Sequence, residues 1–549
     1  MAHSKIFSGD LPELLSEIIQ YFHYDYKTLH SCILVNRLWC RLAIPILWED
    51  PFSIKFPKNY HFIEIYLHNL NEDDKIKLKE YGININELFP SNTLFKYPKF
   101  IQHLDTRKIS NSIENWETVI RQSNSSVQKS ILQIPNFIKL IFKSLIQVFI
   151  ENGINLRSLE VSLLSHQGCE NFDDNFELIL QNPNFIYNIK NLRLDIFITA
   201  ETVTKFFTFL NSNCNSISSL YFLFPSYCNN YPIIEKGLSQ IINSQENLQK
   251  ILFGFNNFPL HHSLLSLKNS NCSNTLNTII FYYIDFKTIN VLNEVFNHLN
   301  VLESIHIIFC HSLDTKLIQQ IINITKPFKL KSLFLNEILQ IESLELLIQK
   351  FGNDVEDFGI NVKIKPQQLL QLLELAIKYC CKIRYLYLPV WLNNQNINLV
   401  FNLIENIKQS LNYLLIDIPN YDNNFSSSIL QNLGQILPFK LKYLNLSLAI
   451  NENDIEIFLK NSQNTFIEKL LIKNKKKKEN EDIFIHIKEY IMKKRRVKYL
   501  AILETFREKS EDLFFLKDKV KEFEFYGIQV LDYCSLYIDI NYFIKEIYL

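Results

Sequence analysis

The chain has 549 residues, of which 47% are hydrophobic, and its 57 basic and 57 acidic side chains cancel. Without a global field to attract polyanions, neither nucleic acid nor a membrane surface is an expected partner, and no run of 18 apolar residues predicts a membrane span. The ten cysteines show no CxxC spacing and the chain does not open on a secretory signal, so we expect reduced thiols in a cytoplasmic or nuclear protein.

The first segment of the chain, residues 8–50, predicts three short helices. Asp10 can cap the first helix and Asp25 the second, while Arg37 to Trp48 forms a third that Pro45 interrupts. The apolar residues are more numerous than a unit of about 40 residues can bury by itself. We therefore expect part of this apolar surface to bind a partner.

This segment resembles an F-box. The residues that carry the resemblance are Leu11, Pro12, Ile18, Leu29, Cys32, Val35, Asn36, Arg37, Trp39 and Trp48, in that order. The resemblance implies that Leu11, Pro12, Ile18, Leu29, Val35, Trp39 and Trp48 form the interface with a Skp-family adaptor. The alternative is a helical cap that only covers the open end of the following domain.

Residues 51–135 are less periodic and are punctuated by prolines. Residues 75–81 and 114–122 predict helices, and residues 100–104 predict an irregular strand. Aromatic and aliphatic residues are frequent and low-complexity runs are absent, so we expect an ordered connecting and capping segment rather than a free linker.

A repeat dominates the rest of the chain, residues 136–549. The pattern apolar-x-x-apolar-x-apolar returns at intervals of 23 to 33 residues. It begins at Leu156, Ile189, Ile217, Leu248, Leu276, Leu302, Leu330, Val355, Ile383, Leu411, Leu441, Ile467, Val497 and Val520. Each unit reads as helix, polar turn and strand, for example a helix over 369–378 and a strand over 383–388. Such units cannot bury their apolar faces alone, so they stack into a solenoid.

The repeats resemble leucine-rich repeats, although the Asn or Cys that follows the strand in that family is mostly missing, with Cys310 as one of the few candidates. The expected fold is an α/β solenoid, an irregular leucine-rich-repeat horseshoe preceded by a small all-α F-box. Within each strand, alternation sends residues such as Leu159 and Val161 inward, and Ser158 and Glu160 to the other face.

A stripe of polar aromatic residues is expected on the strand face of the C-terminal half. Tyr385, Tyr387, Tyr413, Tyr443 and Asn445 occupy outward positions of consecutive strands. Tyrosine is enriched at binding hot spots, so these side chains are candidates for binding a target protein. The alternative is that compositional bias supplied the tyrosines, or that they stack for structural reasons.

Catalytic signatures are missing from the sequence. No phosphate-binding glycine loop, HExxH or GxSxG occurs, and the adjacent His261 and His262 lack acidic or Cys partners at ligand spacing. We therefore expect no catalytic residue, no metal and no cofactor. Two basic clusters, residues 473–478 and 493–496, can be read either as a bipartite nuclear signal or as solvated surface.

Together the two resemblances imply a non-catalytic substrate-recognition subunit of an SCF-type (Skp–cullin–F-box) ubiquitin ligase. The F-box would dock a Skp-family adaptor and, through it, a cullin, while the repeats would hold a target protein. The alternative is an interaction scaffold whose F-box-like helices have no role in ubiquitin transfer.

Overall fold

The computed structural model describes residues 12–54, 57, 59–70, 72–80, 93–123, 134–163, 175–196, 200–224, 231–256, 260–361, 364–388, 396–418, 423–476, 483–506, 509–540 and 543. The chain divides into two compact units. The first contains residues 1–252 and 262–276, and the second contains residues 253–261 and 277–549.

The first unit opens with three helices, α2 (Pro12–Gln20), α3 (Tyr26–Ile33) and α4 (Arg37–Leu47). Asp25 caps α3 by accepting a hydrogen bond from the Thr28 amide at 3.1 Å, as predicted. Asn36 caps α4 in the same way, accepting from the Trp39 amide at 3.0 Å. The helix α4 runs through Pro45, where we predicted an interruption, because buried residues on both sides of it, Ala43, Ile44 and Ile46, hold this turn in the core.

The described residues of the predicted connecting segment form helices and one strand. The segment contains helices α5 (His61–Leu67) and α6 (Glu72–Glu80), strand β1 (His103–Asp105) and helix α8 (Thr106–Ser123). Strand β1 pairs in parallel with β2 (Ser158–Leu163) and starts the sheet there. The strand expected over residues 100–104 is therefore present only in part, because residues 97–100 form a short 3-10 helix.

The repeats of the first unit follow in chain order. Helix α9 (Ile134–Glu151) precedes β2, and helix α11 (Ala200–Asn213) lies between β3 (Asn191–Ile196) and β4 (Ser219–Leu223). Strands β2, β3 and β4 pair in parallel without a register shift. Leu159 and Val161 are buried whereas Ser158 and Glu160 are half-exposed, which confirms the predicted alternation. The other elements assigned mainly to this unit are α12 (Tyr231–Ser244), α13 (His261–Ser266) and α14 (Ser270–Thr275), while β5 (Lys250–Asn256) contains the point where the units divide.

In the second unit the same order of strand and helix continues. Its strands are β6 (Thr278–Ile284), β7 (Ser304–Cys310), β8 (Lys329–Leu335), β9 (Asp357–Ile360), β10 (Tyr385–Leu388), β11 (Tyr413–Asp417), β12 (Lys440–Leu448), β13 (Phe466–Lys475) and β14 (Val497–Phe506). Each pairs in parallel with the next. A parallel sheet in chain order, with a helix between successive strands, is the solenoid that the repeat predicts.

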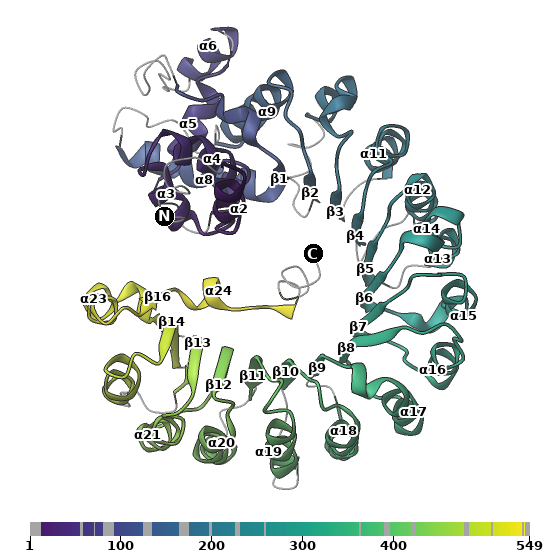
Figure 1. The fold of residues 1–549 in the computed structure, drawn as a ribbon, viewed down its shortest axis with the longest axis vertical. Helices are drawn as coiled ribbons and strands as arrows, with labels where there is room; N and C mark the ends of the chain where they lie inside the picture. Colours follow the sequence, from purple (N-terminus) through teal and green to yellow (C-terminus); the bar gives the residue numbers. More distant parts are fainter. Residues whose placement is uncertain are drawn as a thin grey trace. The chain divides into compact units, whose positions relative to one another are not determined.

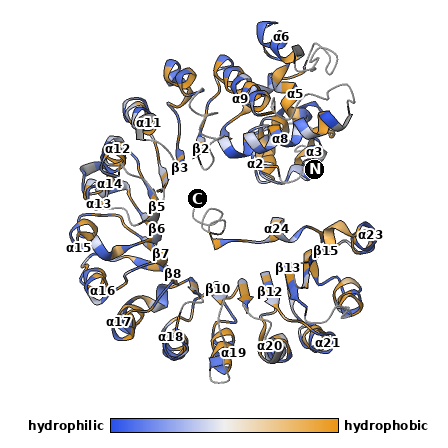
Figure 2. Cartoon of the chain, turned by 180° about the vertical axis from the view of Figure 1, so that it is seen from behind, coloured by the Kyte–Doolittle hydropathy of each residue, from blue (hydrophilic) through white to orange (hydrophobic). Residues whose placement is uncertain are grey.

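The connecting helices of the second unit lie along one face of its sheet (Figure 1). They are α15 (Leu292–Phe296), α16 (Thr315–Ile322), α17 (Ile341–Phe351), α18 (Pro366–Tyr379), α19 (Asn396–Asn406), α20 (Asn423–Ile436), α21 (Glu452–Asn461) and α22 (Phe484–Ile487). Figure 2 shows that these helices combine hydrophobic and hydrophilic residues. Their buried residues, such as Leu317, Ile318 and Ile321 of α16, pack toward the sheet and leave the opposite strand face to other parts of the chain.

The prediction of a strand at Val520 is wrong. Residues 517–525 form helix α23 (Lys517–Phe525), in which Phe523 is buried and Phe525 is exposed. The sheet is instead completed by the antiparallel strand β15 (Lys509–Asp512) and the short parallel strand β16 (Gln529–Val530), both paired with β14. The chain then continues through a short helix, α24 (Tyr533–Leu536).

Candidate functional sites

The N-terminal three-helix unit, α2 to α4, has a small core of its own. That core consists of Leu15, Ile19, Leu29, Cys32, Trp39, Ala43 and Ile46. A second set of apolar residues in the unit faces solvent: Leu14 and Ile18 on α2, Tyr21 directly after α2, and Leu34 and Val35 between α3 and α4. Leu14, Ile18 and Tyr21 are spaced so that they follow one stripe of a helix. The unit therefore exposes more large apolar side chains than its fold requires, which is typical of an interaction surface.

Six of the seven predicted adaptor-binding residues divide into three groups. Pro12, Ile18 and Val35 are exposed, with 40% and 54% of the last two accessible, and remain available to a partner. Leu29 and Trp39 are not accessible, because they fill the core of the unit. Leu11 lies outside the described residues.

Trp48, the seventh predicted adaptor-binding residue, is half-buried and packs on the segment that follows the unit. Its ring packs on Tyr66 and Tyr97 of the connecting segment, with ring centroids 5.6 and 4.2 Å away. Trp48 therefore joins the three-helix unit to the segment that follows it. The sequence placed Trp48 correctly at the end of the unit but not its partners, which lie 18 and 49 residues further along the chain.

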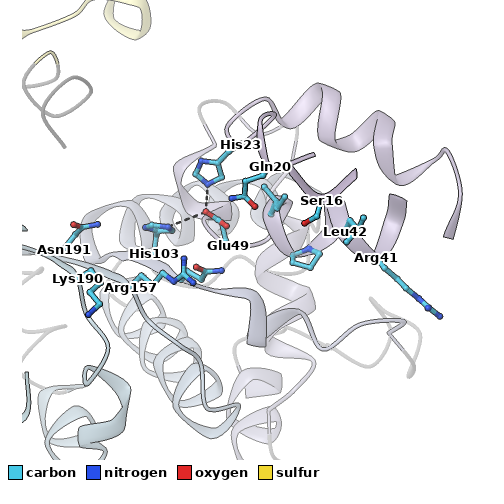
Figure 3. A pocket seen from close by; sticks show the side chains of 13 residues that line it. Ser16, Gln20, His23, Arg41, Leu42, Glu49, His103, Arg157, Lys190 and Asn191 are labelled. Carbon is cyan, nitrogen blue, oxygen red and sulfur yellow. Dashed lines mark hydrogen bonds and ion pairs between the residues drawn. The ribbon is translucent and has the colours of Figure 1, made fainter. Parts of the chain in front are cut away.

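A carboxylate between two histidines also joins the three-helix unit to the first strand. Glu49 pairs with His23, which follows α2, and lies 3.4 Å from Nε2 of His103 on β1 (Figure 3). The backbone carbonyl of Glu49 also accepts hydrogen bonds from the amides of Gln102 and His103, at 3.0 and 3.2 Å. We call this group, His23, Glu49 and His103, the Glu49 clasp.

Charge and burial shape the titration of the clasp. Burial alone would raise the pKa of Glu49, but the hydrogen bonds from His103 and His23 outweigh it and lower the pKa to about 2. The hydrogen bond to Glu49 in turn raises the pKa of His23, against the opposing effect of burial. No sequence motif indicates the clasp, because its three members are far apart in the chain.

A cavity of about 540 Å³ lies beside the clasp. Its lining includes Gln20, Arg41, Pro45, Arg157 and Lys190 (Figure 3). Arg157 and Lys190 are exposed, so their charges are well solvated. The lining combines one buried carboxylate with solvated cations, and nothing in it selects a particular ligand.

The structure brings the predicted tyrosine stripe together. Tyr385, Tyr413 and Tyr443 are direct neighbours in the register of β10, β11 and β12. Their ring centroids are 5.9 and 6.2 Å apart along the row. Tyr387 and Asn445 lie two positions further along their strands, on the same face. We call these five residues the tyrosine face.

We expected the tyrosine face to be open to solvent, but it is largely buried. Tyr385 is 1% exposed, Tyr443 and Asn445 are also buried, and Tyr387 and Tyr413 are half-buried. Burial raises the pKa of the Tyr385 hydroxyl well above its usual value. Side chains that point away from the interior of a solenoid become buried only when another segment covers them.

The covering segment is the C-terminal part of the same unit, described for residues 529–540 and 543, which we call the C-terminal segment. The ring of Phe543 lies 3.9 Å from that of Tyr385 and 5.4 Å from that of Tyr413, between centroids. The Tyr533 hydroxyl donates to Oδ1 of Asn445 at 2.9 Å, and the Ile538 amide donates to the Tyr443 hydroxyl at 3.0 Å. The sequence showed no repeat signal after residue 525, and therefore gave no register that could place this segment on the strands.

A buried polar row continues the tyrosine face onto the preceding strands. His306, Ser332 and Asp357 are neighbours in the register of β7, β8 and β9, and Asp357 is the neighbour of Tyr385. The Ser332 hydroxyl lies 2.7 Å from Nδ1 of His306 and donates to Oδ2 of Asp357 at 2.6 Å. Serine is therefore the central member of the row. A serine nucleophile needs histidine in that central place, between the hydroxyl and the carboxylate.

The other features considered in the sequence were the basic clusters, metal sites and membrane spans. In the first basic cluster, residues 473–478, Lys475 forms an ion pair with Asp417 at 2.6 Å and Lys476 forms one with Glu504 at 2.8 Å. These two lysines are therefore paired with acidic residues of the same chain. Within the described ranges, no group of three or more His, Cys, Asp or Glu residues is arranged to hold a metal ion. None of the described helices is both long and apolar enough to cross a membrane.

Comparison with known proteins adds a distant likeness of fold. No protein-family model and no curated protein matches the chain. Among solved structures, it is similar to the crystal structure of the Rad7 and Elc1 complex in yeast, at 15% sequence identity and a TM-score of 0.33. The alignment covers 72% of this chain and 78% of the other.

Proposed function

We propose that this protein is the substrate-recognition subunit of an SCF-type ubiquitin ligase. The N-terminal three-helix unit acts as an F-box that docks a Skp-family adaptor and, through it, a cullin. The leucine-rich-repeat-like solenoid holds a target protein. The protein works in the cytoplasm, the nucleus or both, without nucleic acid, membrane or cofactor.

The observation that carries this proposal is the second apolar set of the three-helix unit. Ile18 and Val35 match the F-box pattern in sequence and are exposed, together with Leu14, Tyr21 and Leu34. The unit already has a separate core, so these side chains are not needed to hold its helices together. A helical cap that only closed the solenoid would have no use for an apolar surface that faces solvent.

In this function the chain contributes binding rather than chemistry. A receptor that holds a target beside a ubiquitin-charged enzyme converts a bimolecular transfer into an effectively intramolecular one. The proposal therefore requires two binding surfaces and no catalytic residue in this chain. In the row of His306, Ser332 and Asp357 the serine is central, which is not the arrangement of a serine nucleophile and favours a structural role.

Co-expression with a Skp-family adaptor, followed by size-exclusion chromatography, tests the proposal. We expect the two proteins to elute together. The matched control is a chain that lacks residues 1–47, because it keeps Trp48 and Glu49, which contact the connecting segment. If the full chain elutes apart from the adaptor, or the truncated chain retains it, the three-helix unit is not an adaptor-binding F-box and the scaffold alternative is favoured.

A further inference from the structure

The C-terminal segment contacts the tyrosine face through a few anchors separated by exposed residues. Tyr533, Leu536, Ile538 and Phe543 are buried, whereas Cys534, Tyr537 and Asp539 are exposed. The anchors are therefore spaced as Tyr-x-x-Leu-x-Ile-x-x-x-x-Phe. Alternating buried and exposed positions are typical of a peptide bound on a surface, whereas a segment of the core is buried continuously.

The tyrosine face supplies both parts of a peptide-binding site. The rings of Tyr385 and Tyr413 make an apolar floor under Phe543. The Tyr443 hydroxyl accepts a hydrogen bond from a main-chain amide, that of Ile538, and Asn445 accepts one from the Tyr533 hydroxyl. Apolar pockets lined by a few polar groups that fix orientation are what specific ligand sites require.

The segment makes fewer main-chain hydrogen bonds to its support than the strands beneath it make to one another. Its only strand pairing in the described residues is β16, where Gln529 and Val530 pair with Tyr499 and Leu500 of β14. From Tyr533 onward, its described contacts with the tyrosine face are ring stacking and single hydrogen bonds to side chains. Segments with few main-chain bonds to their support open at a lower free energy than the sheet.

We propose that the tyrosine face is a binding site for an extended peptide with aromatic and aliphatic anchors, and that the C-terminal segment is its resident occupant. A target peptide with an aromatic residue near each end and aliphatic residues between them binds by displacing this segment. That the displacing partner is a target for ubiquitin transfer rests on the proposed function. The peptide site itself does not depend on it.

Because the C-terminal segment belongs to the same chain, it competes strongly with an external peptide for the tyrosine face. A segment joined by a short linker is present at an effective concentration in the millimolar range. The apparent dissociation constant of an external peptide rises by the inverse of the fraction of chains in which the face is open. If about 1% of chains are open, the full chain binds the peptide about 100-fold more weakly than a chain whose segment is released. Only peptides with matching anchors then compete.

A full-length variant whose C-terminal segment no longer binds the tyrosine face, called the released chain, tests the proposal. The substitutions Tyr533→Ala and Phe543→Ala remove two anchors from the segment while keeping β16. The probe is a fluorescently labelled peptide of residues 529–543 with the natural sequence, and its binding is followed by anisotropy. We expect the peptide to bind the released chain at least about tenfold more tightly than the unmodified chain.

Two matched controls locate the binding. A labelled peptide that itself carries both alanines should not bind. Adding Tyr385→Ala and Tyr443→Phe to the released chain should weaken binding of the natural peptide by about tenfold or more. If the released chain remains folded by circular dichroism and binds the natural peptide no better than the unmodified chain, the segment is a fixed part of the fold and the proposal is wrong.

A second measurement on the unmodified chain covers the case in which the released chain does not fold. Hydrogen exchange should show the Ile538 amide opening faster than amides of β13 and β14, without global unfolding. Equal protection of Ile538 and these strands would overturn the proposal. Neither readout involves the adaptor, so a failure here is distinct from a failure of the adaptor interaction.

Discussion

The ring of Phe543 lies 3.9 Å from the ring of Tyr385, between centroids, although the two residues are 158 positions apart in the chain. Phe543 is 2% exposed and Tyr385 is 1% exposed. Each ring therefore excludes water from the other, and this contact covers the part of the tyrosine face formed by Tyr385. The relationship explains why tyrosines that point away from the solenoid interior are buried.

Replacing Phe543 alone should expose Tyr385. We expect Phe543→Ala to increase the rate at which Tyr385 is nitrated by tetranitromethane, because the ring that covers Tyr385 is gone. Peptide mass spectrometry measures the modification at each tyrosine. Tyr21, which is 88% exposed, is the internal control and should react equally fast in both proteins. Unchanged, slow nitration of Tyr385 would show that Phe543 does not control access to the face.

The sequence predicts the repeat architecture well because a solenoid repeats one local pattern. The strand positions from Leu156 to Val497 follow from spacing and apolar alternation, which act within each repeat. The end of the solenoid was harder to predict. Val520, Phe523 and Phe525 satisfy the same pattern, but this stretch forms α23, and the strand that pairs there is β16. A pattern of three apolar residues fits both a short strand and a short helix.

The candidate sites were predictable only in part, and for a physical reason. The register of parallel strands brings Tyr385, Tyr413 and Tyr443 together, and that register follows from the repeat. Their burial depends on Phe543 and Tyr533, which lie outside the repeat. In the same way, the apolar pattern of residues 10–50 could not separate the core residue Leu29 from the exposed Ile18, because that division depends on how the three helices pack.

A glycine on β9 makes room for the aromatic cluster beside the tyrosine face. A Cβ atom on Gly359 would lie 2.2 Å from Cδ1 of Phe334 and 3.2 Å from Cβ of Tyr387. Gly359→Ala should therefore lower the free energy of unfolding of the second unit by about 1–3 kcal/mol, the usual cost of overpacking. Chemical denaturation measures the effect. Adding Phe334→Leu should restore part of the loss, and no such rescue would show that the clash has another origin.

The Glu49 clasp should give the first unit a defined pH dependence. The pKa of Glu49 is lowered from 4.5 to about 2, so its contribution to stability is present above pH 4.5 and is lost as the pH falls toward 2. The pKa of His23 is raised above 6.5, so its contribution is present below pH 6.5 and is lost as the pH rises through the raised value. The clasp should therefore stabilise most between about pH 4.5 and 6.5.

Glu49→Gln tests this pH dependence. The difference in unfolding temperature between the unmodified chain and Glu49→Gln should be largest near pH 5.5 and smaller at pH 8 and pH 3. The substitution should also lower the pKa of His23, because it removes the negative charge that raises it, and NMR titration of the imidazole reads this directly. A difference in unfolding temperature that does not change with pH would contradict the ionic role of Glu49.

Replacing a residue of the core by Ala should have a different effect from replacing one of the exposed apolar residues of the three-helix unit. Leu29→Ala empties a fully buried site and should destabilise the unit by about 2–5 kcal/mol. Ile18→Ala removes a side chain that is already 40% exposed and should cost much less. Limited proteolysis within residues 12–47 measures the difference. Equal protease sensitivity of the two variants would show that core and surface have been assigned incorrectly.

The most direct measurement is the affinity of the purified chain for a purified Skp-family adaptor, compared between two double variants. Ile18→Ala with Val35→Ala changes the proposed docking surface. Ile233→Ala with Leu346→Ala removes apolar side chains of similar exposure from other helices. Our account predicts that the first pair weakens adaptor binding by about tenfold or more and that the second leaves it unchanged. Equal affinities of the two variants, or no binding of the unmodified chain, would contradict the account.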